Sequence, residues 1–233
     1  MRVRKWWISD IHGYASGLKK LIRESDIDLE NDLLFIGGDM IDRGPDSGEV
    51  IKYVYHLDKT FPNVRVQQGN HEQLLRHHLD GVISREMYLM NGGDQTLQSF
   101  RQTFEEEELH KHLRWLFALP MMNSDEEYLY LHAGFDPHIP LAEQTSEEVL
   151  WVREPFLEAD SNEILHMTKG KKVVHGHTPS AEVIEDESRI RCDLGVFLPV
   201  GGRLALVNLT EKVYWGWKRR NGKVYFRSVQ KKK

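Results

Sequence analysis

With 233 residues, 40% of them hydrophobic, the chain can bury one good core, and we expect residues 1–233 to form a single catalytic domain. Its net charge of −5 and its lack of a long single-sign block argue against nonspecific nucleic-acid binding. The only cysteine, Cys192, excludes an intrachain disulfide framework and a cysteine-built zinc site, and it favours the reducing cytoplasm as the location.

No signal peptide is expected at the N-terminus. The basic N-terminus is followed by a short apolar run, Trp6 to Ile8, which is far shorter than the core of a signal peptide. No apolar run approaches the length of a membrane span, so a membrane is not expected as a partner. The three lysines that end at Lys233 are expected to form a solvated tail.

The first part of the chain alternates predicted strands with amphipathic helices. Short apolar runs predict strands at residues 6–8, 33–36 and 64–66. Between these strands, residues 18–22 and 50–57 carry leucine, isoleucine and valine at helical spacing. This is the βαβ pattern of an α/β fold with parallel central strands.

The middle and the end of the chain differ from this first part. Residues from about 72 to 119 are predicted to be helical. Later strands are predicted at residues 128–132 and 172–175, around Ile190, and at residues 204–209 and 213–217. The alternating segments of this last third indicate antiparallel strands, from which we expect a second sheet packed on the first.

Each predicted strand of the α/β pattern ends in potential metal ligands. The motifs are SDIHG at 9–13, GGDMIDRG at 37–44, GNHE at 69–72, HAG at 132–134 and HGHT at 175–178. Taken singly, each could be a helix cap, a turn or a buried polar histidine. Five in register are poorly explained by coincidence, because open α/β sheets bind ligands beyond the carboxyl ends of their strands. Aspartate, histidine and asparagine without thiolate suit Mn²⁺, Fe or Zn²⁺.

The ordered set of motifs resembles the calcineurin-like metallophosphoesterases. DRG followed by GNHE resembles their phosphoprotein phosphatase branch, especially its small bacterial and phage serine/threonine protein phosphatases. The motifs span Asp10 to Thr178, and residues 192–195 followed by 202–206 are more loosely similar to the closing strands of that family. The resemblance implies an α/β sandwich of two mixed β-sheets flanked by helices.

The resemblance also implies a site for two divalent ions, with Mn²⁺ preferred and Fe or Zn²⁺ as alternatives. The implied ligands are Asp10, His12 and Asp39 for one ion, and Asn70, His132 and His177 for the other, with Asp39 shared. Two such ions would lower the pKa of a shared water for in-line attack on phosphorus, without a phosphoenzyme. His175 is interpreted as structural, and the role of Glu72 is left open.

Further residues are implied to act on the substrate. His71 resembles the general acid of the family, oriented by Asp42, and Arg43 would hold phosphate oxygens through its paired donors. Arg153 resembles a second phosphate-binding arginine, and its alternative is a surface ion pair with Glu154.

We therefore expect a metal-dependent phosphomonoesterase, specifically a serine/threonine protein phosphatase acting on phosphorylated proteins or peptides by direct attack of a metal-bridging hydroxide. The alternative is a bis(5'-nucleosyl)-tetraphosphatase acting on diadenosine tetraphosphate and other nucleotide polyphosphates. Asp42 and Glu72 favour the first, because the resembling tetraphosphatases commonly lack that aspartate and carry Asp after GNH. Pro179, where diesterases of the family carry a further histidine, argues against a nuclease. A scaffold without activity is disfavoured, since every expected ligand is present.

Overall fold

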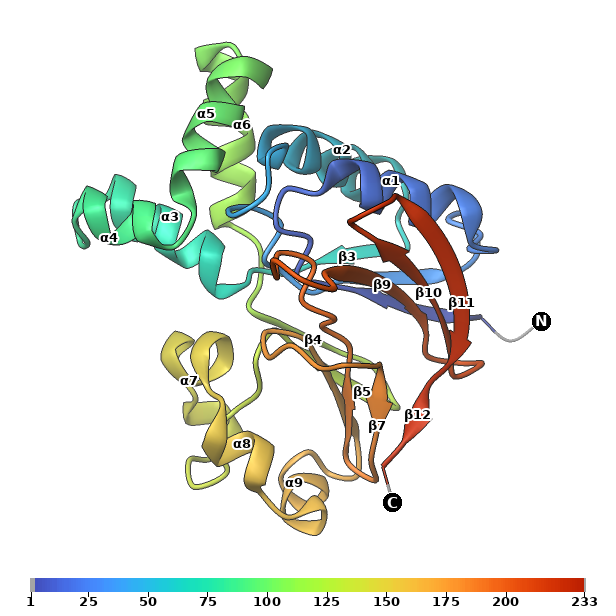
Figure 1. Ribbon diagram of the computed structural model, residues 1–233. Helices are drawn as coiled ribbons and strands as arrows, with labels where there is room; N and C mark the ends of the chain where they lie inside the picture. The colour runs from blue at the N-terminus through green and yellow to red at the C-terminus, as the bar shows by residue number, and fades with distance from the viewer. Residues whose placement is uncertain (1–2, 233) are drawn as a thin grey trace.

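The computed structural model describes residues 3–232. Outside the described residues lie Met1 and Arg2, at the basic N-terminus, and Lys233, in the predicted solvated tail. The described residues form two six-stranded β-sheets that pack face to face, with helices on the outer side of each sheet (Figure 1). The predicted α/β sandwich of two mixed sheets is therefore confirmed. Within residues 3–232, no helix combines the length and the apolar character that a membrane crossing requires.

The first sheet joins the N-terminal parallel strands to three strands from the end of the chain. Its members, in spatial order, are β11 (Lys223–Ser228), β10 (Val213–Lys218), β9 (Arg203–Asn208), β1 (Lys5–Ile8), β2 (Leu33–Ile36) and β3 (Val64–Val66). As predicted, β1, β2 and β3 are parallel, whereas β9, β10 and β11 pair antiparallel with their neighbours. Trp6 pairs with Asn208 and Trp7 with Val207, so β9 covers an edge of β1 that would otherwise be open.

The second sheet is built on a parallel centre. Its members, in spatial order, are β12 (Gln230–Lys231), β7 (Ile184–Glu185), β8 (Arg189–Arg191), β6 (Lys172–His175), β5 (Tyr128–Leu131) and β4 (Met122–Ser124). The strands predicted in the last third of the chain thus divide between the two sheets, because β9 to β11 continue the first sheet. Lys231, predicted to lie in a solvated tail, is exposed but pairs with Glu185 through β12.

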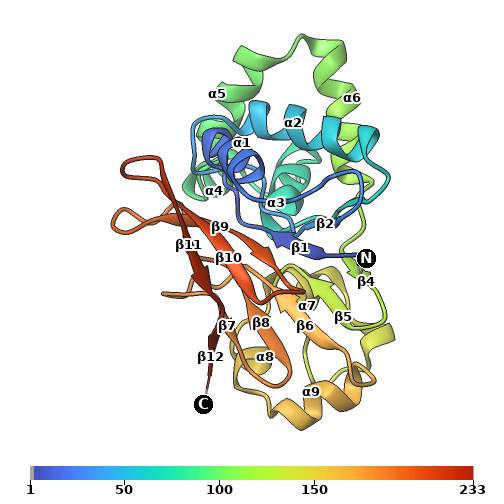
Figure 2. The ribbon, with the colours of Figure 1, turned by 90° about the vertical axis from the view of Figure 1, so that its right-hand side faces the viewer.

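Helices cover the outer faces of both sheets. On the side of the first sheet lie α1 (Ala15–Glu24), α2 (Ser47–Thr60), α3 (Asn70–Leu79), α4 (Arg85–Met90), α5 (Gly93–Thr103) and α6 (Glu106–Phe117). Beside the second sheet lie the 3₁₀ helix η1 (Leu141–Glu143), α7 (Ser146–Trp151), α8 (Glu154–Glu158) and α9 (Ser161–Met167), as Figure 2 shows from a second direction. The helical middle predicted from the sequence is confirmed as α3 to α6.

The alternation of side chains along the strands divides the interior into layers. Trp6 faces the helices of the first sheet, while its neighbour Trp7 faces the second sheet and stacks on Tyr130, with ring centroids 5.8 Å apart. Leu129, next to Tyr130, points away from that interface toward α7 to α9. Successive strand residues point to opposite faces, so each short strand anchors two apolar layers. The strand ends are therefore held rigidly from both sides.

Candidate active site

The five predicted motifs meet where the carboxyl ends of the central strands of both sheets come together. The backbone N–H of His177, after β6, donates to Asp10, after β1, over 3.0 Å. The ring nitrogen Nδ1 of His132, after β5, lies 2.9 Å from the carbonyl oxygen of Gly37, after β2. These bonds cross from one sheet to the other, so the sandwich itself fixes the relative positions of the motifs.

One group of potential metal ligands consists of His12, Asp39 and His71, whose ligand atoms all lie within 4.8 Å of one another. Asp39 Oδ2 is 3.6 Å from His12 Nε2 and 3.9 Å from His71 Nε2, and all three side chains are buried. Asp10, predicted as a ligand beside His12 and Asp39, is buried nearby and accepts hydrogen bonds from Ser9 and His177. The sequence indicated His71 as a general acid and not as a ligand, but in the structure its ring lies among the ligand atoms of this group.

A second group consists of Asp39, His132 and His177, again with ligand atoms within 4.8 Å. The other carboxylate oxygen of Asp39, Oδ1, lies 3.3 Å from His132 Nε2. The side-chain amide of Asn70 lies 2.9 Å from His132 Nε2 and 3.1 Å from His177 Nδ1. Asp39 belongs to both groups, as its predicted sharing between two ions requires.

The charges of the ligands depend on burial and on Asp39. Burial lowers the pKa of His12, and it lowers that of His177 to about 3, so both imidazoles are neutral and keep one ring nitrogen unprotonated, the form that binds metals. Burial also acts to lower the pKa of His132, but the Asp39 carboxylate overrides it and raises that pKa to about 10. Burial raises the pKa of Asp10 to about 6. The cluster therefore concentrates negative charge on Asp39.

The backbone of the site is strained. Non-glycine residues with positive φ include Asp10, His12, Asp39, Asp42, Arg43 and His177. Each such residue costs roughly 1–2 kcal/mol relative to ordinary backbone. Sharp turns directly after the strands aim these side chains into the site, and the adjoining glycines make room for them. A Cβ at Gly176 would overlap the Asp10 carboxylate, and one at Gly69 would overlap Asp39.

Glu72, whose role the sequence leaves open, ties two of the motifs together. Its buried carboxylate accepts the backbone N–H groups of Asp39 at 2.9 Å, Met40 at 2.8 Å and Gly69 at 2.7 Å. Burial and the Asp39 charge raise the pKa of Glu72 to about 7, and the N–H donors counter that shift. Glu72 thus holds the loop after β2 against the start of α3.

We expect Glu72→Gln to lower the free energy of unfolding by about 1–3 kcal/mol, because a glutamine NH₂ would face backbone N–H groups in place of an acceptor. Urea denaturation followed by circular dichroism measures this. The matched control is Glu126→Gln in an exposed turn, which should change stability by less than about 0.5 kcal/mol. Equal stability of the two variants would show that the three N–H bonds contribute nothing.

His71 is held by a buried polar network. Its Nδ1 lies 2.7 Å from Asp42 Oδ2, while the other oxygen, Oδ1, accepts from the Tyr88 hydroxyl at 2.8 Å and from Thr96 Oγ1 at 2.7 Å. Because the Asp42 carboxylate can only accept, we assign a proton to Nδ1, and Nε2 is directed toward Asp39. That Nε2 is buried without a hydrogen-bond partner among the described residues. Tyr88 and Thr96 were not found from the sequence.

Arg43 lies at the edge of the ligand groups. Its Nη1 is 2.8 Å from His12 Nε2, and its guanidinium stacks on Phe197, with Cζ 3.9 Å from the ring centroid. The His12 ring is accordingly an acceptor at Nε2 and a donor at Nδ1, which lies 3.0 Å from the carbonyl oxygen of Ile41. Arg43 is thus a half-buried cation beside the proposed ligands.

The remaining predicted residues lie farther out. The Arg153 side chain is exposed and, within residues 3–232, forms neither a hydrogen bond nor the predicted ion pair with Glu154. After burial and the charge of His132, the charge of Arg153 also contributes to the low pKa of His177. His175 is buried against Phe156, with ring centroids 5.1 Å apart, and belongs to neither ligand group.

Comparisons with known proteins give the same family as the motifs. The family model for calcineurin-like phosphoesterases matches residues 3–201. A symmetrical bis(5'-nucleosyl)-tetraphosphatase of Proteus mirabilis is 31% identical over 156 residues, which cover 66% of this chain and 52% of that protein. Serine/threonine-protein phosphatase 1 of Salmonella typhimurium is 29% identical over 212 residues, which cover 88% of this chain and 91% of that protein.

Among solved structures, a cold-active protein-tyrosine phosphatase of Shewanella has a similar fold, with a TM-score of 0.66 and 18% identity over 97% of this chain and 80% of that one. The chain spans about half the length of the tetraphosphatases that it matches, such as the 52% of the Proteus protein, but nearly all of the Salmonella phosphatase. By their names, the similar proteins thus act either on dinucleoside tetraphosphates or on phosphorylated residues of proteins.

Proposed function

Because this chain belongs to the calcineurin-like phosphoesterase family, we propose that it is a metal-dependent phosphomonoesterase whose substrates are phosphoserine and phosphothreonine residues of proteins. The observation that most supports this proposal is the Asp42–His71 pair. The two side chains are 2.7 Å apart, and Asp42 also accepts hydrogen bonds from two hydroxyl groups. A serine or threonine alkoxide is a much poorer leaving group than a nucleotide phosphate, so it needs a well-supported acid. The match along nearly the whole Salmonella phosphatase supports the same reading.

The donor set fits two divalent ions. We propose that Asp10, His12 and Asp39 would hold one ion and that Asn70, His132 and His177 would hold the other, with Asp39 contributing to both, as it belongs to both ligand groups. Imidazole nitrogens, carboxylates and an amide oxygen suit Mn²⁺, our preferred metal, and also Fe or Zn²⁺. The buried, unpartnered Nε2 of His177 is an atom that a bound ion or substrate could satisfy. When bound, such a pair supplies positive charge that activates water and neutralises phosphate oxygens.

The residues of the chain then divide the remaining work. Arg43 holds phosphate oxygens, with Arg153 as an exposed second cation at the rim. His71 gives a proton from Nε2 to the departing alkoxide, and Asp42 keeps its ring oriented and stabilises the charged form. We propose that residues 1–233 work as one catalytic domain, and that the enzyme acts in the cytoplasm.

The test compares kcat/KM for a phosphothreonine peptide and for diadenosine tetraphosphate on one preparation supplied with Mn²⁺. The second candidate, a tetraphosphatase, is favoured by the 31% identity to the Proteus enzyme. We expect the peptide to be the better substrate. A ratio of about tenfold or more in favour of the dinucleotide, some 1.4 kcal/mol in transition-state binding, would overturn the assignment.

Arg43→Ala should raise KM and weaken inhibition by inorganic phosphate by about tenfold or more, since a hydrogen bond to a charged group contributes about 1.5–3 kcal/mol. Steady-state kinetics and phosphate inhibition measure this, and metal content should be unchanged. Arg43→Lys should restore only part of the binding, because an ammonium lacks the planar pair of donors. Full rescue by lysine, or loss of metal, would remove the proposed role.

A further inference from the structure

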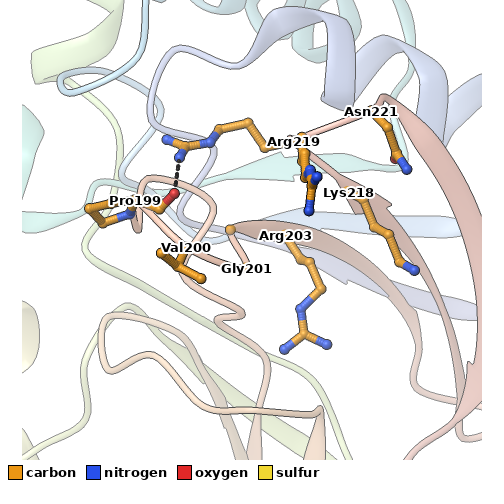
Figure 3. Close-up of a pocket in the computed structure, with 9 residues that line it drawn as sticks. Pro199, Val200, Gly201, Arg203, Lys218, Arg219 and Asn221 are labelled. Atoms are coloured by element: carbon orange, nitrogen blue, oxygen red, sulfur yellow. Dashed lines mark hydrogen bonds between the residues drawn. The ribbon is translucent and has the colours of Figure 1, made fainter.

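A basic cavity of about 950 Å³ lies between the loop before β9 and the turn that joins β10 to β11 (Figure 3). Its lining includes Arg203, Lys218, Arg219 and Arg220, and contains neither an acidic nor an aromatic residue. The chain as a whole has a net charge of −5, so this concentration of positive charge is a local feature. We call it the basic pocket.

The positive charge of the basic pocket is largely unpaired. Lys218 and Arg220 are exposed, and in the part of the chain that the structure describes neither side chain forms an ion pair. Arg219 donates only to uncharged oxygens, among them the carbonyls of Leu198 at 2.8 Å and Pro199 at 3.1 Å, the latter drawn in Figure 3. Arg203 alone has an acidic neighbour, Glu182 at 3.7 Å. A ligand with several negative charges would complete this arrangement.

Contacts of one residue, Phe197, link the basic pocket to the candidate active site. Arg219 donates to the carbonyl oxygen of Phe197 over 3.1 Å, and the ring of Phe197 packs on both Arg43 and His12. The loop held by Arg219 therefore forms a wall of the pocket on one side and of the phosphate site on the other.

We propose that the basic pocket binds acidic side chains that flank the phosphorylated residue of a protein substrate, an inference that rests on the proposed function. Carboxylates pair with arginine and lysine, and long cationic side chains on an open rim accommodate a variable peptide. Val200, at the same rim, is 88% exposed and offers apolar contact. The absence of an aromatic ring from the lining disfavours a nucleotide, whose base would gain from stacking.

The experiment uses two phosphothreonine peptides that differ only in flanking residues, acidic in one and uncharged in the other. Wild type should prefer the acidic peptide by about tenfold in kcat/KM, mainly through KM, and the preference should shrink at high salt. The double variant Lys218→Glu/Arg220→Glu should lose this preference while hydrolysing p-nitrophenyl phosphate at the wild-type rate, which also shows that it is folded.

The matched control is Arg101→Glu/Lys169→Glu, which makes the same change in net charge at exposed cations away from the pocket. It should keep the preference. Three results would overturn the inference: a preference retained in the pocket variant, an equal loss in the control, or a defect on diadenosine tetraphosphate without one on the acidic peptide. If wild type hydrolyses both peptides equally, only this inference fails. If it hydrolyses neither but still cleaves p-nitrophenyl phosphate, the proposed function fails with it.

Discussion

Asp39→Asn is expected to lower kcat by about 10³-fold or more and to remove bound metal, the largest loss among the proposed ligands. Its two carboxylate oxygens serve different groups, Oδ2 facing His12 at 3.6 Å and Oδ1 facing His132 at 3.3 Å. Metal-ion stabilisation of a transition state is worth several kcal/mol. The asparagine amide has one uncharged oxygen, whereas the aspartate carboxylate has two oxygens that share a negative charge. Metal analysis of the purified variant and kcat on p-nitrophenyl phosphate measure the effect.

The control for this experiment is Asp94→Asn, the same substitution at an exposed position of α5, which should leave metal content and kcat unchanged. Chelation of wild type with excess EDTA should reproduce the Asp39 defect, and added Mn²⁺ should reverse it. If Asp39→Asn matched wild type while Asp10→Asn were inactive, the shared role of Asp39 would be wrong. Full activity in EDTA would contradict the metal requirement itself.

His71→Asn should reduce kcat on a phosphothreonine peptide by about 10²–10⁴-fold, the usual contribution of a general acid. The loss on p-nitrophenyl phosphate should be much smaller, because p-nitrophenolate leaves without a proton. Metal content separates this from a ligand role, which is a real alternative because His71 Nε2 lies 3.9 Å from Asp39. Equal losses on both substrates, or loss of metal, would move His71 from acid to ligand.

Asp42→Asn should give a milder form of the same defect, since it leaves His71 in place but removes the charge that stabilises its protonated ring. The double variant should be less impaired than the product of the two single effects, because the two residues act as a unit. Independent, multiplicative losses would indicate that Asp42 supports something other than His71.

The sequence was enough to predict the parts of the site that follow directly from a strand. Asp10, Asp39 and His132 come within three residues of the strand ends that carry them, and parallel strands deliver their carboxyl ends to one edge. The periodicity of apolar residues placed those strands, and the glycines marked the turns. For these ligands, the position predicted from the sequence motif therefore agrees with the position in the structure.

Residues that reach the site by tertiary packing could not be predicted this way. Tyr88 and Thr96 support Asp42 from helices α4 and α5, and a tyrosine or threonine on a helix carries no sign of such a contact. Phe197 lies in a loop that nothing in its own sequence connects to Arg43. The division of the last strands between two sheets was also hidden, because strand pairing over long sequence distances leaves no local periodicity.

The pairing of β1 with β9 affects how the enzyme can form during synthesis. β1 lies inside the first sheet, between β2 and β9, and Trp6 packs on Trp215 of β10, with ring centroids 5.3 Å apart. A growing chain on the ribosome can assemble the β1–β3 unit early, but β1 remains an open edge until residues 203–218 emerge. At about 5–20 residues per second, that delay is on the order of ten seconds or more. During this delay β9 is not yet paired with β1, the strand that leads into the turn carrying Asp10 and His12. A nascent chain should therefore acquire its metals only after its last strands have left the exit tunnel.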